Sequence, residues 1–178
     1  MTLKHNQNGF SLIEMLVSVF ILTIITTLSI TNYRAGEKKN LLNLESNVLL
    51  SNIRKMQNMV LNGSKFDGHE MPFGGYGIHF ESTGYTIFSD DNSNKKYDAG
   101  EAASAVVLQK ISLAETGNNK NLIFFPPKGQ VCVNQDLCPI CDCDIKNGGQ
   151  YSIILTYDET GDAKTVTLNQ ISGRAEIE

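Results

Sequence analysis

An apolar run begins with Gly9-Phe10-Ser11-Leu12-Ile13-Glu14-Met15-Leu16-Val17 and continues to Ile30 without a second charged residue. About 21 residues at a rise of 1.5 Å reach roughly 31 Å, which is the thickness of the hydrocarbon core of a bilayer. A carboxylate in such a segment costs on the order of 2–3 kcal/mol to insert, so Glu14 is a candidate functional residue. The run predicts a membrane-spanning helix over residues 10–30. The alternative is a plain anchor with an accidental acid.

The segment before Gly9 is short and polar and carries one lysine, Lys4. An ordinary secretory signal has its cleavage site after the apolar region, so this arrangement does not fit one. Charge predicts the orientation of the span poorly, because Arg34, Lys38 and Lys39 follow it.

The string Gly9-Phe10-Ser11-Leu12-Ile13-Glu14 resembles the type III signal of type IV pilins and type II secretion pseudopilins. The resemblance implies that residues 1–9 are a leader peptide, which a prepilin peptidase removes by cleavage after Gly9. The same enzyme would then methylate the new N-terminus at Phe10. The resemblance further implies an N-terminus in the cytoplasm, a single span of the inner membrane and a domain outside it. Other pilin or pseudopilin subunits and an inner-membrane assembly platform would be the partners.

The position of Glu14 has a physical explanation within this resemblance. The new amine at Phe10 and the carboxylate of Glu14 are both costly in hydrocarbon when a subunit is alone in the lipid. If subunits stack with an axial offset, the amine of one chain meets the carboxylate of its neighbour, and both charges are neutralised. We therefore expect Glu14 to serve filament assembly.

The helical pattern continues beyond the span, over residues 31–63. Apolar residues recur at three- and four-residue spacings and predict one buried stripe. The stripe consists of Leu41, Leu44, Val48, Leu49, Ile53, Met56 and Val60. Gly36 marks the expected bend, and Gly63 is a suitable C-terminal stop.

From Phe73 onward the pattern changes to a period of two, which is typical of strands. The expected strands are 77–80, 84–88, 105–111, 121–125, 151–157, 164–168 and 172–177. A long helix followed by strands predicts an α+β fold in which an antiparallel sheet, within residues 64–178, packs on the helix stripe.

The end of the chain resembles one subgroup of this family more than the others. The string Thr165-Val166-Thr167-Leu168-Asn169, followed by Ser172-Gly173-Arg174 and a final strand, is similar to the H-type minor pseudopilins and the related FimT minor pilins. Some FimT-like members bind DNA through a basic tail. Here the tail has one arginine against two glutamates, and the net charge of the chain is −4, so a nucleic-acid partner is not expected.

Four cysteines lie close together in the sequence: Cys132, Cys138, Cys141 and Cys143. An even number of cysteines in a polar loop of an exported domain predicts two disulfides, with the pairing left open. A Cys₄ zinc site is the alternative, although the spacing lacks two well-separated C-x₂-C pairs, and free thiols are the third possibility.

A second polar loop has oxygen donors at the alternate positions of an EF-hand calcium loop. These donors are Asp90, Asn92, Asn94, the Lys96 carbonyl, Asp98 and Glu101. Lys95 stands where an EF-hand has glycine, and the flanks read as strands. The alternative is a solvated hairpin loop held by turns in which Asp and Asn side chains accept backbone hydrogen bonds.

The sequence shows no catalytic constellation, because its three histidines are scattered and no nucleophile motif is visible, so we expect no enzyme. Two hypotheses follow. The chain is a filament subunit that takes part in initiation or lies at the tip, or its β-rich domain is a tip module that recognises a secreted substrate or an external surface.

Overall fold

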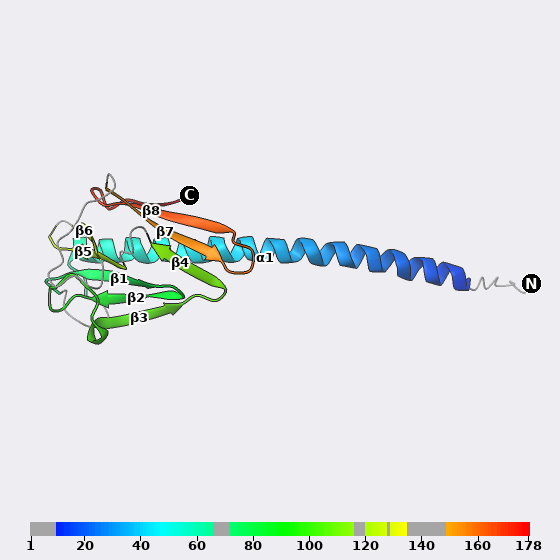
Figure 1. Ribbon diagram of the computed structural model, residues 1–178, viewed down its shortest axis with the longest axis horizontal. Coiled ribbons are helices and arrows are strands. Elements are labelled where there is room, and N and C mark those ends of the chain that lie inside the picture. The colour runs from blue at the N-terminus through cyan, green and yellow to red at the C-terminus, as the bar shows by residue number, and fades with distance from the viewer. Residues whose placement is uncertain (1–9, 66–71, 116–119, 128, 135–148) are drawn as a thin grey trace, which may run out of the picture. The chain divides into compact units, whose positions relative to one another are not determined.

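The computed structural model describes residues 10–65, 72–115, 120–127, 129–134 and 149–178. The chain divides into two compact units, Met1–Asn40 and Leu41–Glu178. The second unit contains all the strands of the described residues and the end of the helix, so the β-rich part of the protein includes the helical residues from Leu41 onward (Figure 1).

Helix α1 covers Leu12–Asn62, which confirms a single helix through the apolar run and the amphipathic segment. It ends as the sequence predicts. Gly63 adopts φ +61°, and its N–H donates to the Val60 carbonyl at 3.3 Å. The Ser64 N–H donates to the Met59 carbonyl at 2.9 Å. This pair of hydrogen bonds is a Schellman motif, which needs the left-handed backbone that glycine adopts without strain.

The strands form two antiparallel sheets, where the sequence predicted one. The first has the order β3-β2-β1-β5-β6 and the second the order β4-β7-β8-β9. The bounds are β1 Tyr76–Glu81, β2 Gly84–Ser89, β3 Ala102–Val107, β4 Ile111–Glu115, β5 Asn121–Phe125, β6 Gln130–Asn134, β7 Gln150–Tyr157, β8 Ala163–Asn169 and β9 Ala175–Ile177. A short 3₁₀ helix, η1, covers Ala99–Glu101. The α+β class is therefore confirmed.

The prediction of one strand over residues 105–111 is wrong. The chain leaves the first sheet after Val107 and enters the second at Ile111, with Lys110 in a left-handed conformation at φ +63°. The Leu108 N–H donates to the Thr83 carbonyl at 2.9 Å, which holds this crossing against the β1–β2 turn. An apolar run does not reveal a change of sheet, because both halves bury alternate residues.

The sequence also missed a strand, since the segment around Cys132 was read as a polar loop. Instead β6 pairs with β5, and Cys132 lies opposite Ile123. Val131, Cys132 and Val133 are all buried. Three apolar residues among polar ones give too short a pattern to predict a strand, and β6 is stabilised by its neighbour.

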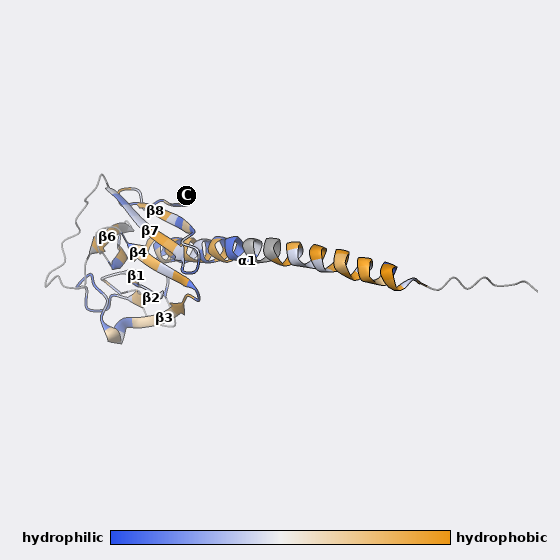
Figure 2. Cartoon of the chain, turned by 45° about the vertical axis from the view of Figure 1, so that its right-hand side comes forward, coloured by the Kyte–Doolittle hydropathy of each residue, from blue (hydrophilic) through white to orange (hydrophobic). Residues whose placement is uncertain are grey.

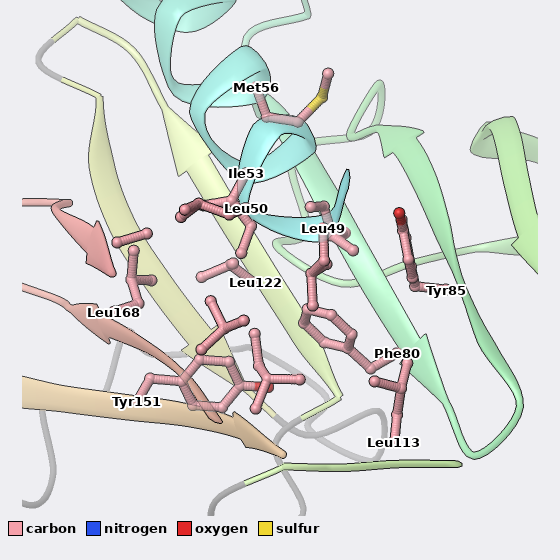
Figure 3. Close-up of a cluster of buried hydrophobic side chains, with 14 of the residues drawn as sticks. Leu49, Leu50, Ile53, Met56, Phe80, Tyr85, Leu113, Leu122, Tyr151 and Leu168 are labelled. Atoms are coloured by element: carbon pink, nitrogen blue, oxygen red, sulfur yellow. The ribbon is translucent and has the colours of Figure 1, made fainter. Parts of the chain in front are cut away.

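The main core lies between α1 and the two sheets. Figure 3 shows Leu49, Leu50, Ile53 and Met56 on the helix near Phe80, Leu122, Tyr151 and Leu168 on the strands, and all belong to one buried cluster. A smaller cluster on the other side of the first sheet contains Phe88, Ile123 and Cys132, with Tyr97 and Phe125 packed against it.

The predicted stripe is right from Leu49 onward, and Leu41 is partly buried against the main core, but the prediction is wrong at Leu44 and Val48. The core side of the helix continues through Leu42 and Ser46, which are buried. Leu44 is 59% exposed and Val48 is 38% exposed. Both sets have helical spacing, so spacing alone does not show which of two neighbouring stripes meets the sheets.

Candidate functional site

The apolar part of α1 has the properties of a lipid-facing helix. Leu12–Ile30 is long and apolar enough to cross a membrane, as its orange colour in Figure 2 illustrates. None of this segment is buried. Its hydroxyl groups bond to carbonyls of the preceding turn: Ser18 to Glu14 at 2.7 Å, Thr27 to Thr23 at 2.8 Å and Ser29 to Ile25 at 2.9 Å. Hydroxyls satisfied in this way cost little in hydrocarbon.

Glu14 lies in the first turn of α1 and is the only ionisable residue within Leu12–Ile30. The helix N-terminus favours a negative charge there. Among the described residues, no cation forms an ion pair with the Glu14 carboxylate, and its side chain is exposed. Phe10 precedes the helix and is 79% exposed. Gly9, at the predicted cleavage site, lies outside the described residues.

The predicted calcium loop connects β2 to η1 and is closed by its own hydrogen bonds. Asp90 is fully buried, and its two carboxylate oxygens accept the N–H groups of Asn94 at 3.1 Å and Lys95 at 2.9 Å. Asn92 Oδ1 accepts the Asn94 N–H at 3.0 Å, and Asn94 Oδ1 accepts the Lys96 N–H at 3.0 Å. These are the side-chain turns that the sequence offered as the alternative to a calcium site.

Asp98 and Glu101 close the other end of this loop. Asp98 Oδ2 accepts the side-chain amides of Asn92 at 2.8 Å and Asn94 at 2.7 Å. Glu101 Oε1 accepts the Asp91 N–H at 3.2 Å, and Oε2 accepts the Asp98 N–H at 3.1 Å. A cation here would have to displace the two amides from Asp98.

Lys95, which stands at the glycine position of the calcium pattern, adopts φ +59°. It therefore has the left-handed backbone for which an EF-hand uses glycine. Its ammonium group lies 5.4 Å from the centre of the Phe125 ring, in a cation–π contact. Within the described ranges, no three His, Cys, Asp or Glu side chains gather in a way that could hold a metal. Calcium binding stays a prediction.

The carboxylates of this loop have opposite pKa shifts. Burial raises the pKa of Asp90, although the backbone hydrogen bonds from Lys95 and Asn94 act in the other direction. Burial also raises the pKa of Glu101. Hydrogen bonds from the Asn92 and Asn94 amides lower the pKa of Asp98. The folded protein therefore destabilises the ionised carboxylates of Asp90 and Glu101 relative to water.

Sequence reasoning missed the residues that attach this loop to the first sheet. His79 is buried, its ring stacks on Tyr97 with centroids 4.7 Å apart, and its Nδ1 lies 2.9 Å from Asn121 Oδ1. The same oxygen accepts the Tyr97 N–H at 3.4 Å. The only sequence signal is a polar residue at an otherwise apolar strand position, because the three residues are far apart in the chain.

Of the four cysteines, the structure describes Cys132, which lies in β6 and is disulfide-bonded. Cys138, Cys141 and Cys143 lie outside the described residues. The number of bridges and their pairing stay predictions.

Comparison with known families matched one profile, described as the prokaryotic N-terminal methylation motif, over residues 4–30. The match includes Gly9, Phe10 and Glu14. It supports a prepilin-processed, type IV pilin-like protein that is cleaved by a prepilin peptidase and assembles with other pilin subunits. Comparison with curated proteins and with solved structures found no match.

Proposed function

We propose that this chain is a minor pilin or pseudopilin, cleaved between Gly9 and Phe10, which enters a filament through its apolar helix and Glu14. One observation carries the proposal: an acid stands alone in an exposed apolar helix, five residues after the cleavage point of the matched motif. An unpaired carboxylate is costly in lipid, so its neutralisation by a neighbour's amine favours assembly over the isolated subunit.

The proposed course begins with the precursor in the inner membrane, with residues 1–9 in the cytoplasm and the β-rich unit outside. Cleavage creates a cationic amine at Phe10, which the same enzyme methylates. In the filament this amine meets Glu14 of an adjacent subunit. The role is structural rather than enzymatic, and we place the subunit among the H-type members, in initiation or at the tip.

Processing is tested by mass spectrometry of the mature protein, which should begin at methylated Phe10. Gly9→Val should leave the precursor uncut, because a branched side chain would stand next to the scissile bond, while Asn8→Ala serves as the control. A mature N-terminus inside the β-rich unit would refute the proposal.

Assembly is tested at Glu14. Glu14→Leu removes an insertion cost of roughly 2–3 kcal/mol, so the subunit should stay in the membrane. Its recovery in sheared filaments should nevertheless fall, since the neighbouring amine loses its partner. Met15→Leu, at the adjacent exposed position, is the matched control. Equal recovery of the Glu14→Leu variant and wild type would refute the ion-pair account.

Deletion of this subunit distinguishes the alternative function, a tip module that recognises a secreted substrate or a surface, from a role in filament initiation. Loss of all filaments would favour a role in initiation. Normal filaments with lost secretion or adhesion would favour recognition.

A further inference from the structure

The edges of the two sheets differ in how they are protected. An exposed edge presents unpaired N–H and C=O groups that can pair with another chain, and proteins normally cover or charge such edges. Among the strands that the structure describes, the four edges are β3 and β6 of the first sheet and β4 and β9 of the second.

Each of three of these edges is short, buried or partly hydrogen-bonded. On β4, the Leu113 N–H donates to the Ser82 carbonyl at 2.9 Å. On β6, Cys132 is fully buried although it lies at an edge. The third edge, β9, has three residues, and its Ala175 carbonyl accepts a hydrogen bond from Arg54 Nη2 at 3.1 Å.

The edge of β3 is different, and its pairing with β2 shows which groups point outward. The two-residue hairpin between β1 and β2 is closed by Glu81 and Gly84, whose backbone groups bond to each other. The next residue, Tyr85, therefore directs its N–H and C=O to β3, where it lies opposite Val106. It follows that Ala105 and Val107 direct their N–H and C=O groups away from β2.

This open edge also lacks the charged residues and prolines that usually prevent an edge strand from pairing with another chain. Strand β3, Ala102–Val107, contains no charged residue and no proline. A register irregularity opposite Ile87 and Phe88 disturbs its start, which leaves Ser104–Val107 as the regular part. Val106 packs against the main core, whereas Val107 is 77% exposed. Among the described residues, no backbone group forms a hydrogen bond to the outer side of this stretch.

We propose that Ser104–Val107 of β3 binds an extended segment of another polypeptide, which adds to the first sheet as a further strand. The backbone groups of Ala105 and Val107 would hold the main chain of the partner, because their donors and acceptors match an extended strand. Strand β3 carries no charge and Val107 is exposed, which fits a segment with an apolar side chain at that position.

The partner is a different chain rather than a second copy. Head-to-tail addition of copies needs a second open edge, and each of the other three is short, buried or partly hydrogen-bonded. Two copies could then pair only edge to edge through β3, which gives a closed dimer. A closed two-fold dimer is not the stacking with an axial offset that a filament needs, so this choice of partner rests on the proposed function as a filament subunit.

The test uses the full chain in detergent micelles and a fluorescein-labelled peptide, Thr-Val-Thr-Val-Thr-Val-Thr, as the probe. Fluorescence anisotropy should show saturable binding, and the same peptide methylated at its three central amide nitrogens should not bind. Val107→Lys and Ala105→Pro should each weaken binding about tenfold or more, since a charge and a missing amide both deter strand pairing. Ile171→Lys is the matched control, because Ile171 is 76% exposed outside the strands.

Amide hydrogen exchange provides a second readout. It uses the wild-type chain, so it does not depend on whether the proline variant folds. The peptide should slow exchange at Ala105 and Val107 and leave Val106, which already bonds to β2, unchanged. The inference is overturned if no saturable binding occurs or if Val107→Lys binds as well as Ile171→Lys. It is also overturned by a dimer that depends on Val107. Failure of cleavage at Gly9 would refute the proposed function but leave the peptide result standing.

Discussion

Leu49→Ala and Leu44→Ala make the same chemical change on one helix, and the structure predicts very different costs. Leu49 is fully buried in the main core, in the same cluster as Phe80 and Leu122 (Figure 3). Burial of a leucine side chain is worth about 1.5–3 kcal/mol, and the cavity left by truncation adds to the loss. We therefore expect Leu49→Ala to lower the free energy of unfolding by about 2–5 kcal/mol.

Leu44 is 59% exposed, so only about two-fifths of the transfer term applies and no closed cavity forms. That gives a loss of about 0.6–1.2 kcal/mol, which the higher helix propensity of alanine reduces slightly. The difference between the two variants should exceed about 1 kcal/mol.

The measurement is urea unfolding of the full chain in detergent micelles, without reductant, followed by tyrosine fluorescence. The chain has six tyrosines and no tryptophan, and buried Tyr76 and Tyr151 report on the core. The slope of free energy against urea should be unchanged, so that the midpoint reports stability. Equal costs for the two variants, or a larger cost for Leu44→Ala, would show that the helix presents Leu44 and Val48 to the sheets.

Three further predictions concern the loops of the β-rich unit. If the loop from Asp90 to Glu101 binds calcium, chelation should lower the melting temperature, and the double change Asp90→Ala with Glu101→Ala should remove that sensitivity. Calcium at a hundredfold excess over its dissociation constant contributes about 2.7 kcal/mol to stability. A melting temperature that chelator does not change would refute the calcium site. Reductant should cost about 2–5 kcal/mol of stability through loss of native bridges, including the one at Cys132, and it should cost Cys132→Ser less because that variant already lacks one bridge. Four titratable thiols in the exported protein would contradict this. Because the pKa of Glu101 is raised in the folded state, the folded chain binds its proton more readily than the unfolded chain, so this residue's contribution to stability grows as the pH falls from neutral through the raised folded pKa. Glu101→Gln should flatten that part of the stability profile, measured by urea unfolding in chelator, and an unaltered slope would refute the assignment.

Much of the fold could be predicted because it depends on residues close together in the chain. The apolar run to Ile30 is long enough to span a membrane whatever follows it, and Gly63 stops the helix through hydrogen bonds to the preceding turn. The β1–β2 hairpin forms around Ser82 and Thr83 as its alternation predicts. Glu14 could be singled out for the same reason, since its cost arises from the neighbouring apolar residues.

The tertiary structure decided what depends on residues distant in sequence. Burial of Leu42 rather than Leu44, the separation of β3 from β4 and the pairing of β6 with β5 all require the packed sheets to be in place. The exposure of the β3 edge is of the same kind, because an edge is open or covered according to what the rest of the chain places beside it. Helical and strand periods describe one element at a time, whereas packing chooses between faces by the apolar area that several elements remove from water together.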